Sequence, residues 1–282
     1  MTDELLKKYE EEENYKELIK LIDKLILENS QKTSLLLYKK AEALIGLEKY
    51  EQAITTLKVF LKGCDEKDKF KGYITLSQCY SWLDDDENTV DALENALEYE
   101  PENELVLKQL SYITYINQDF VKCCEFIKKL IEIDKADIED YTNLIFCCIQ
   151  LDRIDDALKY AEKVIELDPT NLDVFATLTI VYESQEDDEK LKEVCERIIN
   201  LKDDGTLQII LLKAQAYLEI GKKKEAFEFV DKAIKLNPYD PFPYLMKGIL
   251  YNKLEMFDEA NECFVEAFRL NPELINMMDE LS

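Results

Sequence analysis

The chain has 282 residues, 47% of them hydrophobic, and only 6 Gly and 6 Pro, a composition that favours long helices around a buried core. Its 61 acidic and 35 basic residues leave a net charge of −26, which repels nucleic acid and anionic membrane surfaces and permits a basic partner without requiring one. No His is present, which excludes Ser-His-Asp triads, Cys-His nucleophile pairs and H-E-x-x-H zinc sites.

Two helices are predicted in residues 1–33. The first is highly charged and ends near Glu12, whereas the second begins at Tyr15 and is amphipathic, with Leu18 and Ile22 on one face. A charged first helix with one face in water is typical of the terminal cap of a repeat array.

A similar pair of helices is then predicted seven more times along the chain. Recurring apolar columns place these units at residues 34–69, 70–103, 104–137, 138–171, 172–206, 207–240 and 241–274. Two extra residues fall within a Gly- and Lys-bearing stretch, Leu61–Gly72, and one falls near Asp203–Gly205. Both insertions are expected in connections between units.

Three independent columns share this register. Pro101, Pro169, Pro238 and Pro272 are separated by 68, 69 and 34 residues, which is two, two and one periods of 34 with one extra residue. A tyrosine column and an apolar column agree with it, and their members are Tyr80, Tyr182, Tyr217 and Tyr251, and Ala96, Leu130, Val164, Ile198, Ala233 and Ala267. A fixed period of about 20–50 residues predicts a solenoid array.

The last unit shows the pattern most completely, through Tyr244, Gly248, Tyr251, Ala260, Phe264, Ala267 and Pro272. At these residues the chain closely resembles the tetratricopeptide repeat (TPR) family, from which only Lys247 departs, where Leu is usual. The resemblance covers nearly the whole chain. It implies an all-α fold, a right-handed superhelical solenoid of helix-turn-helix repeats, with residues 1–274 in a single array and residues 275–282 as a C-terminal capping tail.

The tail is predicted to form a short amphipathic helix that docks on the last unit. Its apolar stripe consists of Leu274, Met277, Met278 and Leu281 at helical spacing. The final helix of a solenoid exposes an apolar face that needs a cover, which the tail would supply. The competing interpretation is exchange of the tail with a second molecule.

No motif predicts catalysis, a cofactor or a metal site. The pairs Cys123–Cys124 and Cys147–Cys148 suggest a four-Cys zinc site, but adjacent helical residues point about 100° apart, so core packing is the favoured interpretation. Residues 84–95 begin like a calcium loop, but Thr89 stands at its sixth position and Asn95 at its twelfth. The repeat register explains that stretch as a turn between two helices.

In the TPR family, side chains of each first helix line a concave groove that receives a peptide or a partner helix. Carried over to this chain, the resemblance implies groove columns on the first helices that contain four acids and three bases in all. Because these columns are nearly neutral, partner choice should depend on apolar and amide contacts. The candidate groove residues are Tyr112, Tyr115, Asn143, Phe146, Ile149, Ile180, Leu211, Leu212, Gln215, Phe242, Met246 and Ile249.

Two apolar patches are expected in this groove. The middle patch consists of Tyr112, Tyr115, Phe146 and Ile149, and the end patch of Leu211, Leu212, Phe242, Met246 and Ile249. Such stripes are often core, but exposed patches of this kind mark interaction surfaces.

Some TPR proteins bind a C-terminal carboxylate with Lys and Asn from successive repeats. Lys108 and Asn143 match two of those places, whereas Asp173 stands where Lys is expected and would repel a carboxylate. We therefore predict no such clamp.

These features predict a non-catalytic scaffold that binds a protein or peptide, without nucleic acid, membrane or cofactor. Two alternatives stay open, a self-assembling structural protein that forms a homodimer and the regulatory subunit of an enzyme on another chain. The start, Met1–Glu4, shows no signal-peptide pattern, and no apolar run approaches the ~20 residues of a spanning helix. We expect a cytoplasmic chain whose 8 Cys are reduced.

Overall fold

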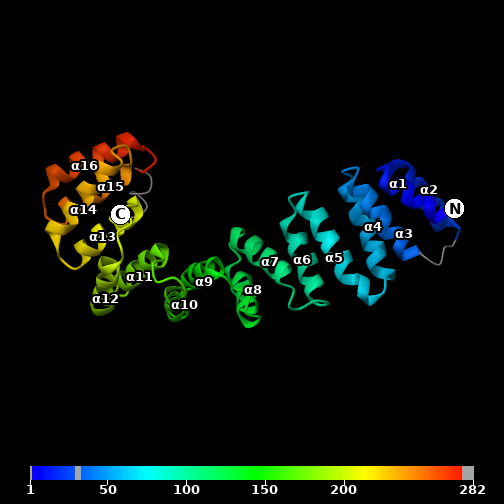
Figure 1. Ribbon diagram of the computed structural model, residues 1–282, viewed down its shortest axis with the longest axis horizontal. Helices are drawn as coiled ribbons and strands as arrows, with labels where there is room; N and C mark the ends of the chain where they lie inside the picture. Colours follow the sequence, from blue (N-terminus) through cyan, green and yellow to red (C-terminus); the bar gives the residue numbers. More distant parts are fainter. Residues whose placement is uncertain (1, 29–32, 275–282) are drawn as a thin grey trace. The chain divides into compact units, whose positions relative to one another are not determined.

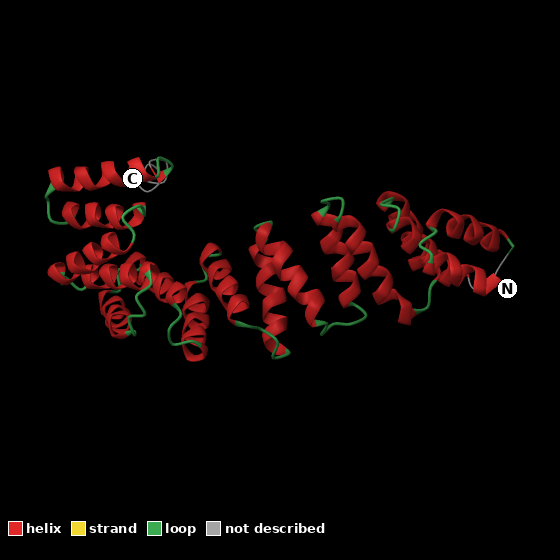
Figure 2. Cartoon of the chain, turned by 45° about the horizontal axis from the view of Figure 1, so that its top comes forward, coloured by secondary structure: helices red, strands yellow, loops and turns green. Residues whose placement is uncertain are grey.

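The computed structural model describes residues 2–28 and 33–274. Sixteen helices and no strand lie in these residues, which confirms the all-α prediction (Figure 2). No helix in this part of the chain is long and apolar enough to cross a bilayer. The helices are α1 (Thr2–Glu11), α2 (Tyr15–Leu27), α3 (Thr33–Ile45), α4 (Tyr50–Gly63), α5 (Glu66–Ser81), α6 (Asp86–Leu97), α7 (Glu104–Ile116), α8 (Phe120–Glu132), α9 (Ile138–Gln150), α10 (Ile154–Leu167), α11 (Leu172–Ser184), α12 (Asp188–Asn200), α13 (Leu207–Glu219), α14 (Lys223–Leu236), α15 (Pro241–Asn252) and α16 (Phe257–Leu270).

The chain divides into two compact units, Met1–Arg153 and Ile154–Ser282. Within each unit, consecutive helices pack side by side (Figure 1). The closest pairs are α3–α4, α5–α6 and α7–α8 in the first unit, and α13–α14 and α15–α16 in the second. Each of these pairs joins the two helices predicted for one repeat, whereas the division into eight repeats in a single array remains a prediction.

A residue with left-handed backbone closes the turn between the two helices of each predicted repeat. Eight such residues in the described chain recur at intervals of 35, 36, 34, 34, 34, 35 and 34, and they are Glu13, Glu48, Asp84, Gln118, Asp152, Glu186, Gly221 and Glu255. After each of them the second helix begins two residues later. The following N–H returns to a carbonyl five residues back, as Lys49 N does to Leu44 O at 2.9 Å.

The first predicted insertion lengthens a helix instead of a connection. Only Cys64 and Asp65 separate α4 from α5, and α5 has 16 residues, beginning four residues before the predicted repeat boundary. Gly72 therefore lies inside α5, where an added Cβ would come within 2.6 Å of Leu61 Cδ2, so its placement in a connection is wrong. The second insertion lies in a connection, residues 201–206, as predicted.

Small residues stand where the paired helices approach each other. Six alanines of the paired helices are between 0% and 2% exposed, and they are Ala41, Ala53, Ala157, Ala214, Ala226 and Ala260. The larger Leu178 is also 1% exposed, whereas Tyr244 and Phe264 of the last repeat are only partly buried. These alanines and Leu178 therefore belong to the core.

The tail prediction rests mostly on residues outside the described chain. Leu274, its first apolar residue, is 3% exposed. Met277, Met278 and Leu281 lie outside the described residues, so docking of the tail remains a prediction.

Gly248 allows α15 and α16 to approach closely, since a Cβ at this position would lie 2.5 Å from Phe264 Cε1. Ala in a helix is normally more stable than Gly by up to about 1 kcal/mol. We expect the clash to reverse that sign, so that Gly248→Ala lowers the free energy of unfolding by about 1 kcal/mol in urea titrations followed by circular dichroism. Gly63→Ala is the matched control, because nothing lies within 4 Å of its added Cβ, and it should be neutral or stabilising. Equal effects of the two substitutions would contradict the close approach.

Candidate functional site

The candidate groove residues lie on α7, α9, α11, α13 and α15. Five are exposed, namely Tyr112 (64%), Phe146 (41%), Ile180 (62%), Phe242 (50%) and Ile249 (38%). Six are partly buried, namely Tyr115, Asn143, Ile149, Leu211, Gln215 and Met246. Leu212 is 8% exposed, so its prediction as a groove contact is wrong, because a side chain inside the core cannot reach a partner.

The middle patch is a cluster of aromatic rings in the first unit. Tyr115 of α7 and Phe146 of α9 have ring centroids 5.6 Å apart in an edge-to-face arrangement. Phe120, the first residue of α8, lies 5.8 Å from the Phe146 ring. Burial raises the pKa of Tyr115. Phe120 is not among the predicted groove residues, because it belongs to a second helix, outside the columns that the family pattern assigns to the groove.

The end patch is more deeply packed than the middle patch. Leu211 and Met246 pack against two buried clusters of the second unit. Together with the burial of Leu212, this leaves Phe242 and Ile249 as the exposed members of the patch. The end patch therefore presents less apolar surface than its sequence predicts.

A pocket of about 540 Å³ opens between α5, α6 and α7. Trp82, at the C-cap of α5, and Tyr112 of α7 line it, and their side chains are 51% and 64% exposed. Gln78, Ser81 and Gln109 add uncharged polar groups to the lining. Trp82 is not among the predicted groove residues, because it follows the last residue of the first helix and so lies outside the groove columns.

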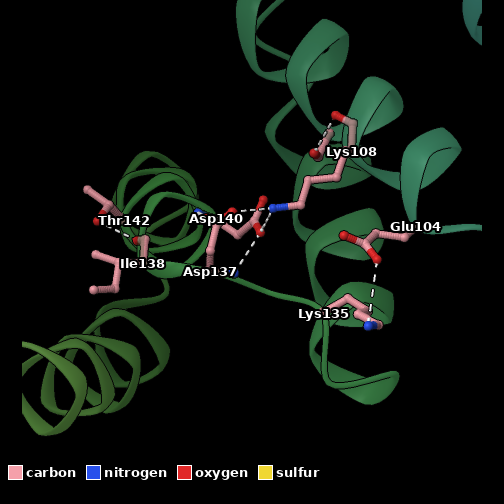
Figure 3. Close-up of polar contacts among 8 residues, drawn as sticks. Glu104, Lys108, Lys135, Asp137, Ile138, Asp140 and Thr142 are labelled. Atoms are coloured by element: carbon pink, nitrogen blue, oxygen red, sulfur yellow. Dashed lines mark hydrogen bonds and ion pairs between the residues drawn. The ribbon is translucent and has the colours of Figure 1, made fainter.

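Lys108 reaches from α7 to two aspartates at the start of α9 (Figure 3). Its Nζ donates to Asp140 Oδ2 at 2.7 Å and to Asp137 Oδ2. The two aspartates also cap α9, because Asp137 Oδ1 accepts from Asp140 N at 3.0 Å and Asp140 Oδ2 accepts from Asp137 N at 2.9 Å. A second link, between Lys135 Nζ and Glu104 Oε2 at 3.8 Å, lies nearby in Figure 3.

The contacts of Lys108 with Asp137 and Asp140 change the pKa values of these groups and occupy the ammonium of Lys108. Burial alone lowers the pKa of Lys108, but the hydrogen bonds with Asp137 and Asp140 outweigh burial and raise it. Burial alone raises the pKa of Asp137, but the hydrogen bonds from Lys108 and from Asp140 N outweigh burial and lower it. Lys108 is therefore already bound by two carboxylates of its own chain.

The paired cysteines form one buried cluster on α8 and α9. Cys123, Cys124, Cys147 and Cys148 are at most 1% exposed, as expected for core residues. The Cys123 thiol donates to the backbone carbonyl of Ser111 on α7 at 3.4 Å. Within residues 2–28 and 33–274, no group of three or more potential ligands has a geometry that could hold a metal ion.

The stretch with the calcium-loop resemblance is a turn followed by a helix cap. Asp84 has the left-handed backbone of the periodic turn, with φ 54°. Asp85 caps α6, since its Oδ1 accepts from Asn88 N at 3.2 Å and its Oδ2 from Asn88 Nδ2 at 2.8 Å. The predicted turn between two helices is confirmed.

Paired helices joined by a left-handed turn at intervals near 34 residues, with small residues between the partners, define a helix-pair repeat protein. The family model described as the tetratricopeptide repeat matches residues 146–171, 207–240 and 243–274. Tetratricopeptide repeat protein 16 of Mus musculus is 24% identical over 217 residues, which cover 69% of this chain and 28% of the mouse protein. A TPR repeat-containing protein of Methanocaldococcus jannaschii is 25% identical over 181 residues, which cover 61% of this chain and 32% of that protein. Residues 146–171, 207–240 and 243–274 are therefore tetratricopeptide repeats, and the helix pairs before them share the same period.

The chain matches no more than about a third of the length of these curated relatives, 28% and 32%. Among solved structures, the C-terminal part of a TPR repeat-containing protein from Cytophaga hutchinsonii is similar with a TM-score of 0.56 and 17% identity. The similarity covers 86% of this chain and 96% of that structure, and at this identity it shows the fold alone.

Proposed function

We propose that the chain is a non-catalytic scaffold that binds a protein or peptide segment along the first helices of its first unit. The observation that carries the proposal is a series of exposed aromatic side chains at consecutive first helices. Trp82 at the end of α5, Tyr112 on α7 and Phe146 on α9 are 51%, 64% and 41% exposed. Exposed aromatic groups of this kind are the commonest anchors of protein interfaces.

The chemistry around these rings favours apolar and amide contacts over charge pairing inside the groove. The pocket beside Tyr112 is lined by neutral side chains, including Gln78 and Gln109. The nearby cation, Lys108, is held by Asp137 and Asp140. A partner segment would therefore be bound through side chains that fit between the rings, with the two amides available to its backbone.

The test compares two pairs of exposed aromatic residues. Proteins captured by the wild-type chain from a lysate of its source are identified by mass spectrometry, purified, and titrated calorimetrically. Tyr112→Ala/Phe146→Ala should weaken binding by about tenfold or more, because truncated aromatic anchors typically cost above 1 kcal/mol each. The matched control is Tyr239→Ala/Phe257→Ala in the second unit, whose side chains are 81% and 64% exposed, and it should retain the affinity.

Two results would contradict the proposal. One is equal loss of binding in both double variants. The other is binding that a tenfold rise in salt abolishes while Tyr112→Ala/Phe146→Ala leaves it intact, because the acidic exterior would then be the site. Light scattering of the same variants tests the self-assembly alternative, which predicts that the groove substitutions convert a dimer into a monomer.

A further inference from the structure

The pocket between α5, α6 and α7 combines an apolar base with aromatic side chains that reach solvent. Leu93 of α6, 1% exposed, and the partly buried Ile113 of α7 supply apolar lining, and Trp82 and Tyr112 supply exposed rings. Its volume of about 540 Å³ lies within the usual range for binding pockets and admits a large side chain. None of the residues that line it carries a charge.

The chain around this pocket is strongly acidic. Between residues 72 and 107 there are ten Asp and Glu residues and no Lys or Arg, so this stretch carries more than a third of the net charge of −26. Trp82 and Thr89 both line the pocket, and the turn residue Asp84 and the first two residues of α6, Asp86 and Glu87, lie between them in the chain. These acidic groups therefore adjoin two lining residues along the chain and are not themselves part of the lining.

Three carboxylates beside this pocket have no ion-pair partner within the described residues. Within the same stretch, Glu94 pairs with Lys122 at 2.9 Å and Glu104 with Lys135 at 3.8 Å. Asp84, Asp86 and Glu87 form no ion pair with any cation of the described residues, and all three are exposed. Asp86 and Glu87 also stabilise the N-terminus of α6, which explains their place on the helix but not the absence of every cation over 36 residues.

We infer that this pocket receives an apolar or aromatic side chain of a peptide that carries Lys or Arg beside it, with those cations facing Asp84, Asp86 and Glu87. The inference rests on the proposed function and names the chemistry of the partner. Complementary charge at the edge of an apolar pocket raises the association rate and selects among partners, while the pocket itself supplies desolvated contact. Exposed Trp and Tyr rings also attract cations through their faces.

The charges near this pocket disfavour other occupants. An acidic peptide or a nucleic acid would meet the uncompensated carboxylates. A second copy of this chain, with its own charge of −26, would be repelled on the whole and would have to present one of its few basic segments. A basic peptide is the occupant that these carboxylates favour.

Trp82 makes the pocket directly observable, because it is the only Trp in the chain. The probe is a small matrix of Trp-free peptides of about twelve residues with Phe, Leu or Ala at the centre and Lys, Ser or Glu in the flanks. We expect saturable changes in Trp82 fluorescence with Phe or Leu between Lys flanks, at affinities about tenfold or more above the same centres between Glu flanks. Replacement of the central residue by Ala should remove most of the Trp82 response.

Matched charge variants separate these three carboxylates from the general acidity of the protein. Asp84→Asn/Asp86→Asn/Glu87→Gln keeps the cap residue Asp85 and should weaken the Lys-flanked peptides by about fivefold. Glu189→Gln/Glu193→Gln/Glu196→Gln removes the same charge from exposed positions of α12 and should change their affinity by less than about twofold.

Three results would overturn the inference: equal weakening by the two triple variants, equal binding of Lys- and Glu-flanked peptides, or no saturable response of Trp82 to any peptide. The last result would leave the proposed function standing if Tyr112→Ala/Phe146→Ala still loses its purified partner. The opposite result is also informative. If Tyr112→Ala/Phe146→Ala binds the purified partner normally but Trp82 responds specifically to the peptides, the proposed function is wrong as stated and the pocket remains a peptide site.

Discussion

Phe175→Ala is expected to lower the free energy of unfolding by about 3–5 kcal/mol, the range measured for removal of a fully buried Phe. Phe175 lies on α11 and is 1% exposed. Its removal loses the apolar burial and leaves a cavity that neighbouring helices fill only in part. The guanidinium of Arg197 also lies 5.4 Å from the centre of the ring and would lose that contact. Guanidinium chloride titration followed by circular dichroism measures the change.

Phe242→Ala is the matched control for this substitution. Phe242 also lies on a first helix of the second unit, but half of its side chain is exposed, at 50%. The same chemical change should therefore cost less than about 1 kcal/mol. Similar losses at the two positions would show that Phe175 is not buried as described. A repeat array shares stability between neighbouring units, so Phe175→Ala should also make unfolding of the second unit precede that of the first.

Lys108→Met is expected to lower the free energy of unfolding by about 2 kcal/mol at neutral pH. The substitution keeps the apolar stem but leaves Asp140, whose side chain is 8% exposed, without its cation. The loss stays below that of a fully buried pair because Lys108 is 29% and Asp137 58% exposed, so water screens part of the interaction. Lys20→Met is the control, since the pair of Lys20 with Glu17 is 71% and 46% exposed, and it should cost less than about 0.5 kcal/mol.

The difference between wild type and Lys108→Met should depend on pH at both ends of the scale. The pKa of Asp137 is lowered from 3.8, so its contribution is present above that value and is lost as the pH falls through its folded pKa. The pKa of Lys108 is raised from 10.5, so its contribution is present below that value and is lost as the pH rises through its folded pKa. The full difference is therefore expected from about pH 5 to pH 9. A difference that persists unchanged at pH 2 would contradict the ion-pair account.

Much of the fold is predictable from the sequence because apolar and small residues repeat with the helix pair. Every member of the apolar column is 0% exposed, namely Ala96, Leu130, Val164, Ile198, Ala233 and Ala267. The left-handed turn inside each repeat is harder to predict from the sequence. Of the eight residues that form these turns in the described chain, only Gly221 is a glycine, the residue type that favours this conformation. Elsewhere Glu, Asp and Gln adopt it, because two fixed helices and the returning hydrogen bond impose the conformation.

The candidate site was predicted less completely than the fold, because column counting follows helices and ignores the turns beside them. It placed Tyr112 and Phe146 on exposed surface but also included Leu212, which the packing of α13 buries. It does not include Trp82 or the acidic turn that follows Trp82, since both lie outside the groove columns. Which face of a helix is covered depends on its neighbours, and a single repeat pattern does not contain that information.

The constant length of the left-handed turns determines where repeats can be duplicated or deleted without disruption of a helix pair. The second helix begins two residues after each of the eight turn residues in the described chain, whereas the connections between repeats vary from Cys64–Asp65 to the six residues 201–206. Duplication or deletion with both breakpoints in these connections would preserve every turn and keep whole helix pairs together. The natural modules for shuffling by recombination, and for grafting into other arrays, therefore run from one such connection to the next.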